Sequence, residues 1–240
     1  MYGLTDKGFV VAGGAGVAGE CVTLALLRRG ARVVVPSRTS ERIERLRSGV
    51  EPELLPRLHT LVGDVGNPTD AEEIRDRVSA EFGPIDGVVA SLGAWWEGNV
   101  LTEVPFGTWQ RVLHDNLTAH FLVARTFLPE LADRPGTVYV ALAGIAAIRP
   151  IAGSGPISVT GAAQTMLLRT LEVELADAPV RLHEVAVLTP IVTRHWPAGD
   201  PVERGWLSGE QVGEYVASVA SPDFPDKTSL GLRIPADWEV

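Results

Sequence analysis

Short apolar runs alternate with longer segments of helical periodicity from one end of the chain to the other. The apolar runs are predicted strands at 8–13, 31–37, 58–65, 85–93, 136–144, 180–190 and 229–235. The segments between them are predicted helices at 16–30, from Thr69, at 106–131, at 154–171 and from Ser208. This alternation is typical of βαβ units, and it predicts a three-layer, doubly wound α/β fold around a parallel sheet of about seven strands.

Two of the predicted helices carry a sequence signal for their first turn. Thr69 with Glu72, and Ser208 with Gln211, have the spacing of a capping box, in which each side chain satisfies a backbone N–H of the other residue. The chain has no internal repeat, low-complexity tract or linker at which to divide it. We therefore expect one domain over residues 1–240.

Composition narrows the class of protein. With 240 residues, 45% of them hydrophobic, the chain can bury one substantial core. No apolar run reaches the ~18 residues of a membrane span, and the first residues lack the pattern of a signal peptide. Cys21 is the only cysteine, and a net charge of −9 argues against nucleic acid and anionic membranes as partners. We expect a cytoplasmic protein, without a metal, that binds a small molecule.

Closely spaced glycines follow the first predicted strand. Gly13, Gly16 and Gly19 form G-x-x-G-x-x-G, and Gly14 begins an overlapping G-x-G-x-x-G. Between a strand and a helix, such glycines allow a tight turn and let a pyrophosphate approach the N–H groups at the helix start. The motif predicts the dinucleotide site of a Rossmann fold, and the alternative is a tight turn that binds nothing.

The end of the second predicted strand bears on the choice of cofactor. In NAD(H)-binding proteins an acidic residue at the end of this strand binds the ribose hydroxyls. Here Ser37 and Arg38 occupy the end of the strand, and neither is acidic. Because a guanidinium suits a 2′-phosphate, NADP(H) is expected in preference to NAD(H), with a solvated surface arginine as the alternative. Asp64 and Val65 are expected beside the adenine, although Asp64 also fits a turn or a helix entry.

Further motifs extend the pattern. These are "GDV" at 63–65, "DNLTAHF" at 115–121 and "TPIVTRH" at 189–195. With the glycines and Arg38, they resemble the short-chain dehydrogenase/reductase family over nearly the whole chain. The resemblance implies cofactor contacts by Ser91 and Gly93, and nicotinamide contacts by Thr193 and the backbone near Ile191. It also implies a homodimer or homotetramer through the long central helices.

That family's chemistry uses a Tyr and a Lys four residues apart on one helix, a Ser after the fifth strand and an Asn. A tyrosine, with an ordinary pKa of about 10, needs a neighbouring cation to act as a base near neutral pH. Aligning "PISVTGAAQTMLLRTLEVEL" with the family helix puts Ile157 at the Tyr and Gly161 at the Lys, with Ala143 or Gly144 at the Ser. Asn116 alone remains, as a catalytic or a helix-shaping residue. The alignment predicts a divergent member without ordinary ketone and alcohol redox chemistry.

The loops expected around the pocket supply other candidates. The expected pocket residues are Trp95, Trp96, Glu97, Arg149, Ser154, Ile157 and Trp196. The tryptophans favour a flat apolar or aromatic ligand, or alternatively they cover the core or an oligomer interface. His195 is the candidate acid–base residue because histidine titrates near neutral pH, with a surface histidine as the alternative. Ser158 is expected either to hydrogen-bond a ligand or to cap the helix start.

Three functions fit these features. The first is an atypical enzyme that binds NADP(H) and reduces an activated C=C or C=N bond, or catalyses a non-redox isomerisation, elimination or cyclisation by positioning its substrate. The second is a catalytically inactive NADP-binding sensor or partner of an active homologue. The third is a scaffold in which the nucleotide site is vestigial.

Overall fold

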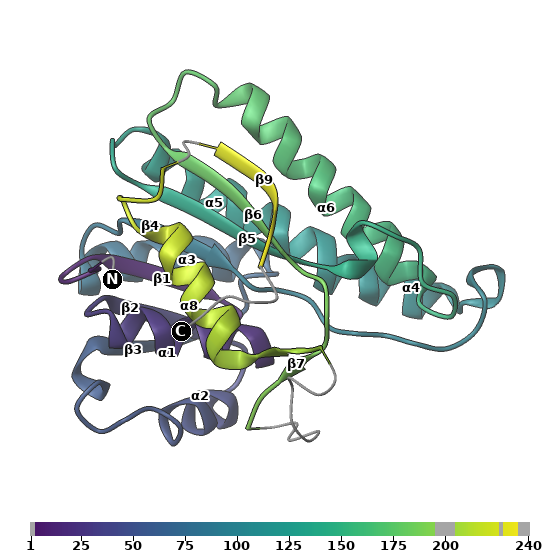
Figure 1. Ribbon diagram of the computed structural model, residues 1–240, viewed down its shortest axis with the longest axis horizontal. Coiled ribbons are helices and arrows are strands. Elements are labelled where there is room, and N and C mark those ends of the chain that lie inside the picture. Colours follow the sequence, from purple (N-terminus) through teal and green to yellow (C-terminus); the bar gives the residue numbers. More distant parts are fainter. Residues whose placement is uncertain (1–2, 195–204, 226–227, 235–240) are drawn as a thin grey trace.

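The computed structural model describes residues 3–194, 205–225 and 228–234. Its main sheet has seven strands in the order β3-β2-β1-β4-β5-β6-β9, and every neighbouring pair is parallel (Figure 1). The strands are β1 (Gly8–Ala12), β2 (Arg32–Ser37), β3 (Leu58–Val62), β4 (Gly87–Ala90), β5 (Val138–Gly144), β6 (Arg181–Val187) and β9 (Thr228–Arg233). The predicted doubly wound α/β fold is confirmed.

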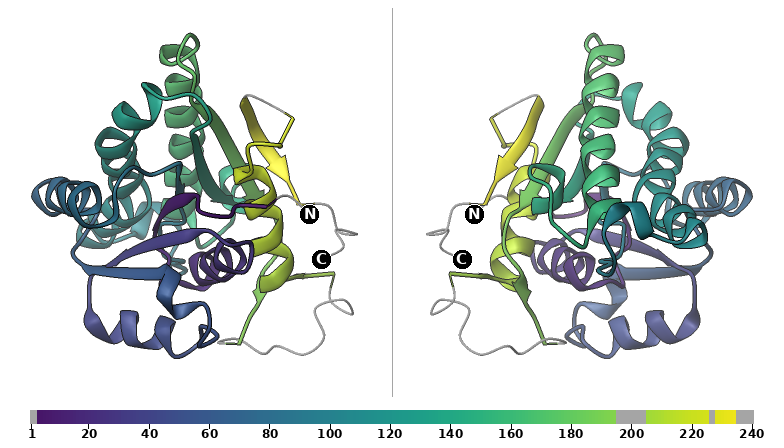
Figure 2. Two further views of the ribbon diagram at one scale, coloured as in Figure 1. Left: turned by 90° about the vertical axis from the view of Figure 1, so that its left-hand side faces the viewer. Right: turned by 90° about the vertical axis from the view of Figure 1, so that its right-hand side faces the viewer.

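Helices cover both faces of the sheet and make three layers (Figure 2). One face carries α1 (Val17–Arg28), α2 (Ser40–Arg47) and α8 (Gly209–Ala220). The other carries α3 (Pro68–Arg77), α5 (Ala119–Ala132) and α6 (Gly155–Glu174). A second small sheet pairs β7 (Ile191–Val192) with β8 (Leu207–Ser208). No helix within the described ranges is long and apolar enough to cross a membrane.

Alternation along the strands divides the core in two. Phe9 and Val11 of β1 pack into the cluster under α1 and α8, whereas Val10 and Ala12 pack into the cluster under α3 and α5. Successive side chains of a strand point to opposite faces, so an almost fully apolar strand is what a sheet covered on both faces requires. This explains why the predicted strands are continuous apolar runs rather than alternating ones.

The two predicted capping boxes have different outcomes. Ser208 and Gln211 form the expected reciprocal pair at the start of α8. The prediction at Thr69 is wrong, because α3 begins at Pro68 and the side chain of Asn67 accepts hydrogen bonds from the N–H groups of Thr69 and Asp70. Proline lacks an N–H and is well suited to a first helical position, so the residue before it becomes the cap.

The long central helix is not uniform. The predicted segment 106–131 is α4 (Phe106–Leu113), a π-helical turn at His114–Thr118, and then α5. The described chain also contains short helical turns at Leu55–Arg57, Val78–Phe82, Leu101–Glu103 and Ile145–Ala147. A π-helical turn widens a helix locally, so it changes which side chains of the central helix face the carboxyl ends of the strands.

Candidate nucleotide and substrate site

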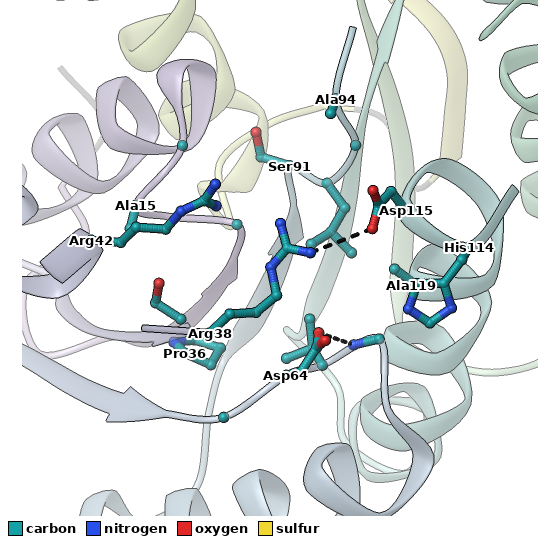
Figure 3. Close-up of a pocket in the computed structure, with 18 residues that line it drawn as sticks. Ala15, Pro36, Arg38, Arg42, Asp64, Ser91, Ala94, His114, Asp115 and Ala119 are labelled. Carbon is teal, nitrogen blue, oxygen red and sulfur yellow. Dashed lines mark hydrogen bonds and ion pairs between the residues drawn. The ribbon is translucent and has the colours of Figure 1, made fainter. Parts of the chain in front are cut away.

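A cleft lies at the carboxyl ends of β1 to β4, where doubly wound sheets bind ligands (Figure 3). It encloses about 680 Å³ of empty space, part of it open to solvent. Eight of the predicted cofactor residues line it: Gly13, Gly16, Ser37, Arg38, Asp64, Val65, Ser91 and Gly93. Residues from separate sequence segments thus meet as the topology predicts.

The glycine turn is shaped by very close backbone contacts. Gly13 has a φ of +82°, and a Cβ there would lie 2.1 Å from the carbonyl oxygen of Ser91. A Cβ at Gly19 would lie 2.1 Å from the carbonyl oxygen of Gly13, so the turn folds directly onto α1. Gly16 precedes α1 without a side-chain cap, which leaves the positive helix end facing the cleft. Gly14 instead packs against Val35 of β2.

Two arginines reach the cleft from the end of β2 and the start of α2. Arg38 was predicted, whereas Arg42 was missed because the strongly polar helix α2 was not recognised. Thr39 caps that helix by accepting a hydrogen bond from the N–H of Arg42 at 3.4 Å. An arginine four residues after Arg38, in the first turn of a capped helix, is the sequence signal that would have found it.

The π-helical turn supplies the opposite wall. His114 and Asp115 both line the cleft, and Asp115 Oδ1 lies 3.4 Å from Nη1 of Arg38. In Figure 3 the Arg38 guanidinium lies between Ser91 and Asp115. Neither His114 nor Asp115 was a predicted site residue. The segment was predicted as one regular helix, and the π-helical turn changes which of its residues face the cleft.

Asp64 forms the turn that its sequence position allowed, and it also lines the cleft. Its side chain accepts a hydrogen bond from the N–H of Gly66 at 2.9 Å, and its own N–H donates to Asp70 at 3.0 Å. These bonds fix the turn between β3 and α3. Because the same residue lines the cleft, the turn holds a carboxylate there.

Asn116 joins the π-helical turn to the segment after β4. Its Oδ1 accepts a hydrogen bond from the N–H of Ala94 at 3.0 Å, and its Nδ2 donates to the carbonyl of Val112 at 3.1 Å. Gly93 has a φ of +113° and lies so close to Asn116 that a Cβ there would be 2.3 Å from Oδ1. Both ends of the amide are therefore occupied by backbone, which is a positioning role.

An apolar wall lies beside this turn. Ile157 of α6, Val112 of α4 and Ala146 form a buried cluster, against which Trp96 and Ile151 pack. One turn further along α6, a Cβ at Gly161 would lie 2.9 Å from the Cα and 3.1 Å from the Cβ of Ala147. Gly144, at the end of β5, has nothing within 4 Å of such a Cβ. The wall is closely packed at position 161 and open at position 144.

A family model described as short chain dehydrogenase matches residues 7–196, which is most of the chain. This chain belongs to the short chain dehydrogenase family. Rabbit (Oryctolagus cuniculus) dehydrogenase/reductase SDR family member 4 is 29% identical over 183 residues, which are 76% of this chain and 70% of the relative. An uncharacterised oxidoreductase of Staphylococcus aureus is 26% identical over 236 residues, 97% of this chain and 99% of that one. Human dehydrogenase/reductase SDR family member 2, mitochondrial, is 29% identical over 184 residues, and the match covers 64% of it.

Solved structures share the fold at lower identity. The structure of ElxO with NADP bound has a TM-score of 0.82 at 20% identity, covering 95% of this chain and 98% of that one. A short-chain dehydrogenase/reductase from Brucella melitensis has a TM-score of 0.81 at 20% identity, with 100% of both chains covered.

The tyrosines and lysine of this family member within the described residues lie away from the apolar wall. Tyr139 and Tyr215 are buried in the two core clusters, and burial raises the pKa of Tyr139 so that it stays protonated. Lys7 pairs with Asp86 at 3.0 Å, and both residues precede strands. They are therefore at the amino edge of the sheet, opposite the cleft.

The predicted pocket residues separate into two groups. Trp96 and Ile157 meet in the apolar cluster, whereas the side chains of Trp95, Glu97 and Arg149 are exposed and do not line the nucleotide cleft. Trp95 is 59% exposed, so the tryptophans do not form one described surface. Trp196 and the candidate acid–base residue His195 lie outside the described residues.

The hydroxyl groups near the start of α6 serve the backbone. Ser158 Oγ accepts a hydrogen bond from the N–H of Ile151 at 3.1 Å and lies 3.4 Å from the carbonyl of Ser154. Ser154 itself is fully buried, and its hydroxyl makes no hydrogen bond with the described residues. Ser158 therefore holds the loop before α6 to the helix, which matches the structural alternative for this residue.

The segment after β6 does not line the cleft. Ile191 packs against Val187, Leu207 and Val212, and Thr193 lies near Gly209 at the start of α8. Arg194 then reaches α1, where its Nε donates to Glu20 Oε1 at 2.6 Å. This ion pair fixes the position of the chain directly before residue 195. Across the described ranges, no three His, Cys, Asp or Glu side chains are grouped as a metal site.

Proposed function

We propose that this chain binds NADP(H) in the cleft and acts on a small apolar or aromatic molecule without the Tyr, Lys and Ser of its family. The observation that carries the proposal is the contrast between two neighbouring sites. The nucleotide cleft has its glycine turn and two arginines. The position aligned with the family's tyrosine is Ile157, in an apolar cluster.

The residues present fit NADP(H). The uncapped start of α1 offers N–H groups to a pyrophosphate. Arg38 and Arg42 offer guanidinium groups to a 2′-phosphate, and Ser37 stands where an acid would favour the ribose hydroxyls of NAD(H). The NADP in the ElxO structure, on the same fold, supports this choice. When bound, the reduced nicotinamide would supply a hydride.

The apolar wall limits the chemistry. Ketone reduction needs a proton donor at the carbonyl oxygen, and a positioned donor contributes about 10²–10⁴ in rate. The described wall offers Ile157, Val112 and Ala146, and the amide of Asn116 is already bound to backbone. We therefore assign reduction of an activated C=C or C=N bond, which needs less proton donation to oxygen, or a non-redox rearrangement that depends on positioning.

A second candidate is supported by the packing at Gly161. The turn at Ile145–Ala147 fills the space that a lysine at this position would need. A protein that binds NADP(H) as a sensor, or as the partner of an active homologue, has no use for that lysine. This candidate shares the cleft with the first and differs from it only in turnover.

Self-association through α5 and α6 is part of the proposal. Val159, Met166 and Val173 are spaced seven residues apart on α6 and are 43%, 57% and 77% exposed. Phe121 of α5 is 48% exposed. Apolar side chains repeated along one helix face favour contact with a second copy of the chain. The proposal places this oligomer in the cytoplasm, with a small molecule as its ligand.

Two measurements test the proposal in sequence. Titration with NADPH, followed by tryptophan fluorescence, should saturate below millimolar cofactor, and the absence of saturable binding would reject both candidates. Turnover of activated enones and cyclic imines with NADPH is then compared between the wild type, Trp96→Ala and His195→Ala. Trp109→Ala is the matched control, because Trp109 lies on α4 outside the cleft and the apolar cluster. Loss of turnover in the first two variants alone supports the enzyme, and no turnover of these substrates by the wild type rejects the reductase.

A further inference from the structure

The strongest unexplained feature of the cleft is the ion pair that crosses it. Arg38 leaves the end of β2 and reaches Asp115 on the π-helical turn, 77 residues later in the chain. The side chains are 49% and 24% exposed, so the pair lies at the open side of the cleft. Figure 3 shows the Arg38 guanidinium in the middle of the space that the lining residues surround.

Arg42 provides an internal comparison. It lines the same cleft from α2, and among the described residues its guanidinium has no ion-pair partner. The cleft therefore holds one arginine that is paired with an acid and one that is not. If the cleft only needed positive charge, Asp115 would be an obstacle, since it pairs with one of the two lining arginines.

We propose that Asp115 competes with the 2′-phosphate of the nucleotide for Arg38, and so sets how tightly this chain retains NADP(H) relative to NAD(H). This inference rests on the proposed nucleotide function of the cleft. A phosphate dianion needs the same guanidinium N–H groups of Arg38 that Asp115 attracts. Ribose hydroxyls have no charge, so Asp115 opposes NAD(H) much less.

The size of the effect follows from the exposure of the pair. An exposed ion pair changes binding or stability by little, so removal of the competitor should tighten binding about two- to fivefold. The effect should appear with any ligand that carries the 2′-phosphate. Adenosine 2′,5′-bisphosphate is therefore a probe that tests the site without the nicotinamide and without turnover.

The experiment is a calorimetric titration of the full chain with NADPH, NADH and adenosine 2′,5′-bisphosphate. Asp115→Asn should tighten the first and third ligands about two- to fivefold relative to NADH. Asp76→Asn is the matched control, because Asp76 pairs with Arg75 on α3 and does not line the cleft. Equal thermal stability of both variants and the wild type verifies that each one folds.

The double variant separates competition from general repulsion. In an Arg38→Met background, Asp115→Asn should change NADPH binding no more than Asp76→Asn does. An equal gain in both backgrounds would overturn the proposal, because Asp115 would then act on the phosphate without Arg38. Weaker or unchanged NADPH binding by Asp115→Asn would also overturn it while leaving the proposed function intact. No binding of NADPH by the wild type would reject both.

Discussion

The side-chain amide of Asn116 holds the N–H of Ala94, so one residue of the π-helical turn fixes the segment that follows β4. Ala94 and Asp115 both line the nucleotide cleft, on either side of this hydrogen bond. This hydrogen bond thus joins the central helix to the segment after β4. A residue with this role contributes first to the stability of the fold, and only through the fold to any reaction.

Replacement of Asn116 by alanine should therefore cost stability. The variant loses two hydrogen bonds, worth about 1–2 kcal/mol together, which lowers the midpoint of thermal unfolding by about 2–8 °C. Circular dichroism measures the change, and Asn99→Ala is the control on the exposed loop nearby. A variant that melts like the wild type yet loses turnover would instead identify Asn116 as catalytic.

Gly161 should not tolerate even a methyl group. Because a Cβ there would lie 2.9 Å from the Cα of Ala147, Gly161→Ala forces the backbone of the Ile145–Ala147 turn to move, at a cost of about 1–3 kcal/mol. Gly107→Ala is the matched control, because Gly107 is also helical and has nothing within 4 Å of such a Cβ. That control should gain up to about 1 kcal/mol from helix propensity. Urea denaturation of both variants measures the change in the free energy of unfolding, and equal gains in stability would contradict the packing argument.

His120 should make the fold sensitive to acid. The ring is fully buried and hydrogen-bonded to the carbonyl of Leu92, and burial lowers its pKa from 6.5 to about 4. Between these two values the unfolded chain binds the proton and the folded chain does not, so stability falls as the pH falls. From pH 7 to pH 5 the loss due to this residue should be about 2 kcal/mol.

The test of this prediction is a pair of histidine variants. His120→Gln keeps an N–H donor for Leu92 and removes the titrating ring, so its urea midpoint should vary less between pH 7 and pH 5. His59→Gln, on the exposed side of β3, should keep the full dependence of the wild type. Identical pH profiles of all three proteins would show that other groups govern the acid response.

The proposed self-association should depend on the apolar face of α6. Met166→Glu places a charge in the middle of this face and should convert a dimer or tetramer into smaller species, which light scattering after size exclusion detects. Val62→Glu, an equally exposed apolar residue on β3, should leave the mass unchanged. A wild type that is monomeric throughout would reject the proposed interface.

The buried parts of this molecule were predictable from the sequence for a physical reason. Strands covered on both faces must be continuous apolar runs, and Val10, Val33 and Val88 each stand within such a run of the chain. The polar helix α2 has no such requirement, since only Ile43 and Leu46 of its eight residues are buried. Its absence from the prediction also hid Arg42.

The sequence predicted the cleft-lining residues that come directly after strands, and it missed those that the π-helical turn brings to the cleft. Gly13 and Gly19 are required by close contacts that only glycine allows, so their spacing is informative by itself. The approach of Asp115 to Arg38 depends on a π-helical turn, and no residue pattern in the central helix predicted that turn. Asn67 shows the same limit on a smaller scale, because its capping role depends on where the helix actually begins.

Gly144 and Gly161 differ in how much space each leaves for a side chain. The Cβ of a serine at position 144 would meet no neighbour within 4 Å, so one substitution would introduce a hydroxyl there without a steric clash at Cβ. A lysine at position 161 requires the Ile145–Ala147 turn to move first, and a tyrosine at 157 has no partner until it does. Under the proposed alignment, the packing of this turn therefore prevents a single substitution from installing the Tyr–Lys pair.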